Sequence, residues 1–138
     1  MDRPKKPRSP HGPEFSIQRD IVRFLTNRGW RVERLVGMAW QSGLPDLLAG
    51  HKDFGMRFIE VKYEDKYHFT QAQKCKFPLL MDHGMGIWIL TEASKEQYDR
   101  LFTTPNLWDY LKRSDCPSED DIDRLMQEIE EENDNAGT

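Results

Sequence analysis

The spacing of hydrophobic residues along the first third of the chain predicts one helix followed by a strand. Between residues 13 and 28, apolar residues recur every three or four positions, as on the buried face of an amphipathic helix. Gly29 is well placed to end this helix. Residues 30–36 alternate between apolar and polar, which is typical of a half-buried strand, and residues 37–43 then read as a loop.

Three further strands are predicted from the apolar segments that follow. Two of them, at residues 44–49 and 56–63, are joined by a hairpin connection over residues 51–55. Residues 56–63 give the strongest strand signal in the chain, because bulky apolar side chains fall among the polar ones. Residues 86–91 are a nearly continuous apolar run, which is typical of a strand covered on both faces.

Helices are predicted between and after these strands. Thr70 and Gln73 have the spacing of a capping box, so a helix is expected over about residues 71–83. The same capping pattern precedes a helix over about residues 94–102, and another helix is expected after Pro105.

The predicted order is therefore helix, three strands, helix, strand and further helices, with no internal repeat. Such an order packs most simply as an α/β or α+β fold, in which helices flank a central mixed sheet. A chain of 138 residues supports one modest hydrophobic core, so a single domain is expected.

Charge is segregated along the chain, so the net charge of −4 misrepresents its central part. Residues 1–13 carry four basic residues and one acidic residue, and we expect them to form an extended, mobile arm. Residues 114–138 carry ten acidic residues against one basic residue. The central domain, residues 14–113, has 15 basic and 13 acidic residues, so it is compatible with a polyanionic partner.

The acidic C-terminal segment also has a narrow apolar stripe. Ser118 is placed to cap a helix that carries Ile122, Leu125, Met126 and Ile129 on this stripe. The stripe is suited to docking on a protein partner or on a second copy of the chain in a homodimer. Simple disorder is the commoner fate of acidic tails, so that alternative stays open.

The sequence has the character of a cytoplasmic protein. No apolar run approaches the roughly 20 residues that cross a bilayer, and no apolar segment follows the basic N-terminal residues as in a secretory signal. Cys75 and Cys116 lie far apart and lack metal-ligand spacing, which fits a reduced protein.

Three polar residues near the second and third strands carry the candidate chemistry. Glu60 and Lys62 are two apart in a predicted strand, so their side chains project to the same face. Burying two charges there is costly unless they are paired or bind an ion. The hairpin brings Asp46 alongside, which places two carboxylates beside an ammonium group. Hard divalent cations such as Mg²⁺ bind one or two carboxylates together with substrate phosphate, so the arrangement favours phosphodiester hydrolysis.

These residues match a known pattern. Pro45-Asp46 followed by Glu60-Val61-Lys62 resembles the PD-(D/E)XK nuclease motif. The surrounding sequence resembles the VRR-NUC branch, which includes small phage and bacterial Holliday-junction-resolvase-like enzymes. The resemblance spans about residues 14–91 and implies a restriction-endonuclease-like αβββαβ core. It also implies an endonuclease that uses Mg²⁺ or Mn²⁺ to cleave DNA, with branched structures as candidate substrates.

The resemblance further implies a role for each site residue. The implied catalytic residues are Asp46, Glu60, Lys62 and Gln73. The implied metal ligands are Glu14, Asp46, Glu60 and the backbone carbonyl of Val61. For two of these a plainer explanation stays open, because Glu14 suits the first turn of a helix and Gln73 suits a capping box.

Nucleic-acid contacts are expected from basic side chains outside the motif: Arg19, Arg23, Arg34, Lys66 and Lys74. Trp40, in the loop ahead of the motif, is placed either to stack on a base or to anchor that loop. Two alternatives to a DNA nuclease stay open. One is a nucleic-acid-binding or assembly subunit that keeps the fold without cleavage, and the other is a nuclease that acts on RNA.

Overall fold

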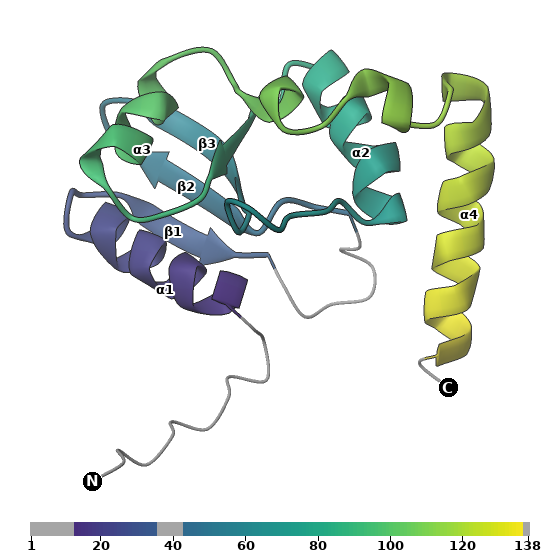
Figure 1. Ribbon diagram of the computed structural model, residues 1–138, viewed down its shortest axis with the longest axis horizontal. Helices are drawn as coiled ribbons and strands as arrows, with labels where there is room; N and C mark the ends of the chain where they lie inside the picture. The colour runs from purple at the N-terminus through teal and green to yellow at the C-terminus, as the bar shows by residue number, and fades with distance from the viewer. Residues whose placement is uncertain (1–12, 36–42, 137–138) are drawn as a thin grey trace, which may run out of the picture.

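The computed structural model describes residues 13–35 and 43–136, and Figure 1 shows how their helices and strands are arranged. The elements, in chain order, are α1 (Pro13–Thr26), β1 (Arg31–Arg34), β2 (Leu47–His51), β3 (Gly55–Val61), α2 (Gln71–Asp82), β4 (Ile87–Leu90), α3 (Lys95–Asp99), the 3-10 turns η2 (Arg100–Phe102), η3 (Leu107–Asp109) and η4 (Arg113–Asp115), and α4 (Glu119–Ala136). The expectations for the basic arm and for Trp40 lie outside the described residues.

The strands form one mixed sheet in the order β1-β2-β3-β4. β2 pairs with both β1 and β3 in antiparallel fashion, and β3 pairs with β4 in parallel. A tight hairpin joins β2 to β3, and its Gly55 has a φ of +82° that suits glycine. α2 supplies the crossover that a parallel pair needs. The mixed α/β fold predicted from the sequence is therefore confirmed.

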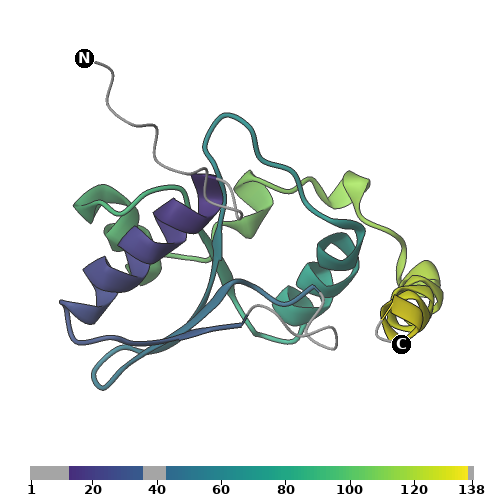
Figure 2. The same cartoon turned by 90° about the horizontal axis from the view of Figure 1, so that it is seen from below.

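Helices cover both faces of this sheet. α1 and α3 lie on one face, α2 lies on the other, and α4 lies outside α2 (Figures 1 and 2). Side chains alternate along β3, so Ile59 and Val61 pack into a core cluster with Ile21 of α1. Phe58 points to the opposite face and belongs to a second cluster with Phe77 of α2. The second half of β3 thus contributes side chains to both layers.

The strands are shorter than the hydrophobic pattern predicts. β1 begins only after Trp30, and β2 begins at Leu47, so Asp46 precedes the strand in which it was expected. The main chain nevertheless stays paired there, because the Leu35 N–H donates to the Asp46 carbonyl at 2.8 Å. Asp46 therefore sits at the end of the sheet, where its side chain is not confined to the pleat of the strand.

The prediction of a helix after Pro105 is wrong, because only the short 3-10 turn η3 forms there. The Asn106 side chain explains this difference. Its Nδ2 donates to the Ile89 carbonyl at 3.1 Å, and its Oδ1 accepts from the Ile89 N–H at 2.7 Å. These bonds tie the chain to the free edge of β4, and Leu107 is fully buried beside it. The helix predicted over residues 94–102 is likewise divided into α3 and η2.

The acidic helix α4 packs on α2. Ile122 is buried, whereas Leu125, Met126 and Ile129 of the predicted stripe are half-buried. An ion pair of 2.7 Å between Arg113 and Asp82 fastens the preceding turn to the end of α2. Within residues 13–35 and 43–136, no helix is both long and apolar enough to cross a membrane.

Candidate active site

Glu60 and Lys62 lie at the end of β3 and project to the same side. Lys62 Nζ is 3.0 Å from Glu60 Oε2, and the two residues are only 3% and 1% exposed, respectively. A buried ion pair of this kind pays a large desolvation cost, which its mutual attraction repays only if further hydrogen bonds satisfy both groups. The neighbouring residues supply those bonds.

Asp46 is linked to the end of β3 by two hydrogen bonds of opposite sense. Its Oδ2 accepts from the Val61 N–H at 2.8 Å, and its own N–H donates to Glu60 Oε1 at 3.1 Å. The Val61 carbonyl points to the same side of β3 as its N–H, as in any extended strand. The two carboxyl groups and this carbonyl are therefore gathered at one end of the sheet.

Gln73 occupies both of the positions that the sequence left as alternatives. Its Oε1 accepts from the Thr70 N–H at 3.0 Å, which completes the capping box of α2. The same oxygen accepts from Lys62 Nζ at 3.2 Å, and Nε2 donates to Glu60 Oε2 at 2.8 Å. One side chain thus caps the helix and binds both members of the buried ion pair.

Gly43 explains how the loop before Asp46 comes close to α2. It has a φ of +83°, and a Cβ at this position would lie 2.7 Å from the Ala72 carbonyl oxygen. Only glycine fits both the backbone conformation and this close approach. The contact sets residues 43–46 against the first turn of α2, beside Gln73.

Glu14 comes to the site from α1. Its Oε1 accepts from the Tyr63 N–H at 3.3 Å, directly after Lys62 in the chain. Glu14 is half-buried, so it lies at the border between the buried network and solvent. The structure therefore brings all five of the implied side chains together, since Glu14 and Gln73 join Asp46, Glu60 and Lys62.

The carboxyl groups of Asp46 and Glu60 both have raised pKa values. Burial raises the pKa of Asp46, and the charge of Glu14 adds to this, although the Val61 N–H, Glu60 and Lys62 act in the opposite direction. Burial, followed by the charge of Asp46, raises the pKa of Glu60 to about 8, against the lowering effect of Lys62. Burial, together with the excess of carboxyl groups over the single Lys62 ammonium, therefore favours the binding of a proton or another cation at this site.

The donor set fits a hard divalent cation that keeps several waters. Within the described residues, no group of three or more histidine, cysteine, aspartate or glutamate side chains is arranged to hold a metal ion by itself. Mg²⁺ does not need such a cage, because it ordinarily binds one or two carboxylates and takes its other ligands from water and phosphate. Asp46, Glu60 and the Val61 carbonyl have this composition.

The basic residues predicted to contact nucleic acid have different settings. Lys66 is exposed in the loop that follows the site, and Lys74 is half-buried one residue after Gln73. Arg34 is exposed at the end of β1, with its guanidinium 5.4 Å from the Phe15 ring centroid next to Glu14. Arg19 and Arg23 are also exposed and lie farther along α1.

Sequence reasoning missed several contacts to the site. The His68 carbonyl accepts from Lys62 Nζ at 2.9 Å, and the Phe69 ring centroid lies 4.4 Å from the same nitrogen. Gln18 is 6% exposed one helical turn after Glu14, and among the described residues its Oε1 has no hydrogen-bond partner. The helical spacing of α1 places Gln18 on its apolar face, and a polar residue on a buried face was a sign in the sequence that it lies near a functional site.

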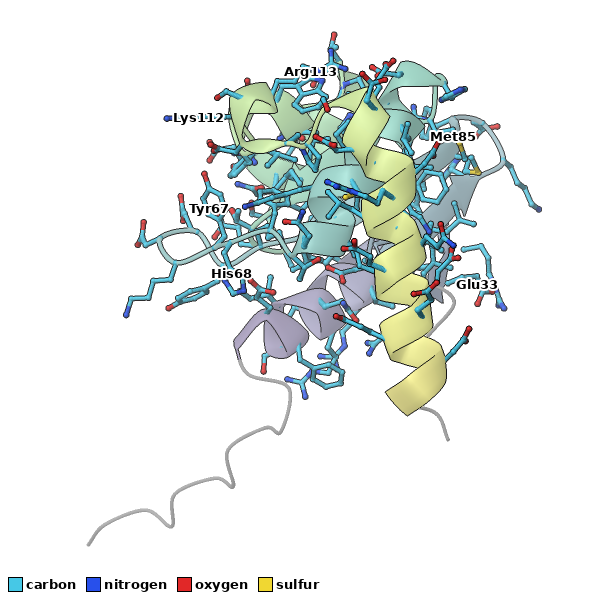
Figure 3. The ribbon with its side chains drawn as sticks, turned by 90° about the vertical axis from the view of Figure 1, so that its right-hand side faces the viewer. Glu33, Tyr67, His68, Met85, Lys112 and Arg113 are labelled. Carbon is cyan, nitrogen blue, oxygen red and sulfur yellow. The ribbon has the colours of Figure 1, made fainter. Side chains whose placement is uncertain are left out.

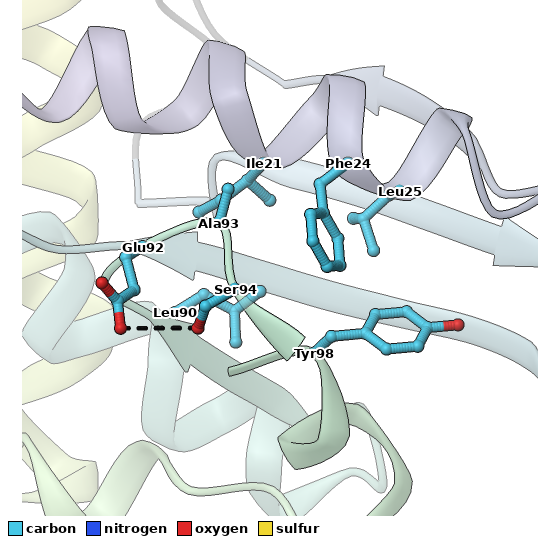
Figure 4. Close-up of a pocket in the computed structure, with 8 residues that line it drawn as sticks. All are labelled: Ile21, Phe24, Leu25, Leu90, Glu92, Ala93, Ser94 and Tyr98. Carbon is cyan, nitrogen blue, oxygen red and sulfur yellow. Dashed lines mark hydrogen bonds between the residues drawn. The ribbon is translucent and has the colours of Figure 1, made fainter. Parts of the chain in front are cut away.

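An apolar crevice between α1 and α3 is separate from this site. Its volume is only about 10 Å³, and Phe24, Leu90 and Tyr98 are among its lining residues (Figure 4). None of the site carboxylates lines it. Ligand pockets usually enclose about 300–1,000 Å³ and contain a few convergent polar groups, so this crevice is better explained as a packing gap.

Comparison with known proteins supports the fold. No protein-family model and no curated protein matches this sequence. A solved structure described as a VRR_NUC domain is similar, with a TM-score of 0.53 and 22% identity, over 64% of this chain and 92% of that chain. A likeness at this identity shows the fold alone. The chain therefore has a VRR_NUC-like fold.

Proposed function

We propose that this chain is a divalent-metal-dependent nuclease of the PD-(D/E)XK class that hydrolyses phosphodiester bonds of DNA. The observation that carries the proposal is the convergence of half-buried Asp46 with the buried pair Glu60 and Lys62, which are joined by short hydrogen bonds at the end of β3. Burial, more than any neighbouring charge, raises the pKa of both carboxyl groups. Strongly perturbed carboxyl groups cluster at functional sites, because a merely structural fold gains little from burying them.

Asp46, Glu60 and the Val61 carbonyl would hold the metal ion, with Glu14 at the border of the site. Mg²⁺ or Mn²⁺ bound there would supply Lewis acidity, which polarises a phosphoryl group and lowers the pKa of water. The carboxylates must be deprotonated to bind it, so metal and protons compete for the same oxygens.

Lys62 supplies a fixed positive charge beside these carboxylates. Its Nζ has three hydrogen-bond partners, in Glu60, Gln73 and the His68 carbonyl, which hold it in one place. A charge positioned in advance stabilises negative charge that develops on phosphate oxygens without reorganisation during the reaction. Gln73 fixes the positions of the Lys62 and Glu60 side chains relative to one another, because it forms a hydrogen bond with each of them.

One observation favours a second candidate function, nucleic-acid binding without cleavage. Both oxygens of Glu60 already accept hydrogen bonds within the protein, one from the Asp46 N–H and the other from Gln73 and Lys62. A network so complete also serves a purely structural role. Metal binding discriminates between the two functions, since a structural network does not need it.

The test is cleavage of supercoiled, linear and branched DNA with Mg²⁺ or Mn²⁺. We expect metal-dependent cutting by the wild-type protein and at least a 100-fold loss in the Asp46→Ala and Glu60→Ala variants, as for removal of a principal electrostatic group. Cutting that persists in these variants would contradict the site assignment. Branched, Holliday-junction-like DNA is the substrate that the family resemblance adds, and an RNA arm separates the two nucleic acids.

A further inference from the structure

An aromatic segment follows Lys62 and leads away from the carboxylates. Phe69 contacts the Lys62 ammonium, and Tyr67 lies beside Phe69 with a ring-centroid distance of 6.0 Å. Tyr67 also contacts Tyr110, which comes from a distant part of the sequence, at a centroid distance of 5.4 Å. One cation–π contact and two ring–ring contacts therefore connect the proposed catalytic lysine to Tyr110.

Tyr67 is the exposed ring of this group, because Tyr110 is half-buried and Phe69 is buried. Tyr67 is 36% exposed. The plane of its ring makes an angle of 83° with the Phe69 ring and of 63° with the Tyr110 ring, so these rings do not stack face to face. The Tyr110 hydroxyl accepts from an Arg100 guanidinium nitrogen at 2.8 Å, and the same nitrogen donates to the Ile89 carbonyl of β4 at 3.4 Å. Tyr110 is therefore anchored to the sheet.

A polar hollow continues this surface beyond Tyr110. Its volume is about 390 Å³, and its lining includes Arg100, Thr103, Asn106 and Asp109. Hydroxyl and guanidinium groups of this kind can bond to base edges or to a phosphate, whereas the Asn106 amide is already bonded to Ile89. Figure 3 shows Tyr67, His68 and Lys112 on the same side of the molecule, so this surface is shared by the loop after β3 and the segment before α4.

The charges on this surface argue against a docking site for a duplex backbone. Lys66 and Lys112 are exposed there, but so are Glu64, Asp65 and Asp109. A surface that follows duplex phosphates carries a clear excess of basic residues, because counterion release supplies most of the affinity. Here cations and anions are mixed, and the Tyr67 ring is exposed beside the half-buried ring of Tyr110. Unpaired bases stack on exposed aromatic side chains whatever their sequence.

We propose that Tyr67 and Tyr110 form a stacking platform for unpaired nucleotides next to the scissile phosphate. The proposal rests on the nuclease function proposed above and narrows its substrate class to nucleic acids with a single-stranded segment, such as flaps or splayed junction arms. A base bound on the platform would continue the chain of contacts that begins at Lys62. The platform would thus place the adjacent phosphate at the carboxylates.

Binding in EDTA tests this proposal independently of cleavage. The probes are a 5′-flap DNA, single-stranded DNA and RNA of the same sequence, and a blunt duplex, with 2-aminopurine in the unpaired segment. We expect Tyr67→Ala to weaken binding of the unpaired probes about 10-fold and to reduce quenching of 2-aminopurine. Binding of the blunt duplex should change less than about 2-fold. Tyr67→Phe keeps the ring and should retain wild-type binding.

Phe54→Ala is the matched control, because Phe54 is an exposed aromatic residue, at 44%, on the hairpin at the opposite end of β3. It should leave the preference for unpaired probes unchanged. Equal effects of Tyr67→Ala on unpaired and duplex probes, or no effect on either, would overturn the proposal. The failures are distinguishable, since absence of cleavage with any divalent metal contradicts only the nuclease function. The DNA and RNA arms show which source of unpaired bases is preferred.

Discussion

Asp46 and Glu60 bind one another through the main chain, because the Asp46 N–H donates to Glu60 Oε1 while the Asp46 carboxylate accepts from the residue after Glu60. The two acidic groups are thereby held close together in spite of their repulsion. This reciprocal arrangement fixes the spacing of the carboxyl groups before any ligand is bound. Its energetic consequences can be measured in the metal-free protein.

Glu60→Gln should flatten the pH dependence of stability. The pKa of Glu60 is raised to about 8 from an ordinary value of 4.5, so the folded state binds the proton more tightly than the unfolded state does. The free energy of unfolding of the metal-free protein should therefore fall as pH rises from about 4.5 to about 8, and the raised pKa of Asp46 acts in the same direction. Thermal unfolding in EDTA at pH 5–8 measures this slope.

Glu64→Gln is the control for that experiment, because Glu64 is an exposed acid four residues from Glu60. It should leave the slope as it is in the wild type. One carboxyl group contributes at most about 1.4 kcal/mol per pH unit, so the flattening in Glu60→Gln should not exceed this value. An unchanged slope in Glu60→Gln would show that Glu60 is not protonated in the folded protein.

Mg²⁺ or Mn²⁺ should stabilise the protein, and more at pH 8 than at pH 6. The metal must displace protons from Asp46 and Glu60, so its apparent affinity rises as these groups ionise. At a metal concentration of about 100 times Kd the expected gain is about 2.7 kcal/mol. Differential scanning fluorimetry at matched ionic strength measures the shift in Tm, and Asp46→Asn should abolish most of it. A shift of equal size at both pH values would argue against competition with protons.

Gln73→Ala and Thr70→Ala should separate the capping role of Gln73 from its role in the site. Gln73→Ala removes one hydrogen-bond partner from each of Glu60 and Lys62, which should cost about 1–3 kcal/mol and lower the cleavage rate at least about 10-fold. Thr70→Ala removes only a capping bond, so it should cost about 1 kcal/mol with cleavage nearly unchanged. Urea unfolding and single-turnover cleavage distinguish the two effects. Equal losses of cleavage in both variants would show that Gln73 affects the site only by capping α2.

Gly43→Ala should damage both stability and the site. The substitution places a Cβ 2.7 Å from the Ala72 carbonyl oxygen and forces a positive φ on alanine, which costs at least about 1–2 kcal/mol. The loop must then move away from α2, and Asp46 moves with it. Gly50→Ala is a suitable control, because a Cβ at Gly50 meets no atom within 4 Å. Comparable unfolding curves for the two variants would contradict the close approach at Gly43.

The main parts of the site could be predicted because they depend on short-range rules. Strand alternation places Glu60 and Lys62 on one face, and the hairpin from β2 to β3 brings Asp46 alongside them. The capping box placed Gln73 at the start of α2. The fold class followed from the same periodicities, since each predicted strand was found within a few residues of its expected position.

The remaining contacts could not be predicted because they join segments that no periodicity relates. The carbonyl of His68 and the ring of Phe69 reach Lys62 from an irregular loop, whose path depends on tertiary packing. Tyr67 meets Tyr110 across more than forty residues of sequence. The helix predicted after Pro105 failed for a similar reason, because a side-chain amide bonded to β4 outweighs local helix propensity.

The bonds between Asn106 and Ile89 also bear on self-association. A strand at the edge of a sheet offers unpaired N–H and C=O groups to any passing chain, and this is a common route to aggregation. The Asn106 amide forms hydrogen bonds with both the N–H and the C=O of Ile89, so these two groups are not available to pair with a strand from another chain. At the opposite edge, β1 has only four residues and carries the Arg31–Glu33 ion pair. Edge-to-edge pairing of two such sheets is therefore disfavoured at Ile89 on the β4 edge and along the short, charged β1 edge.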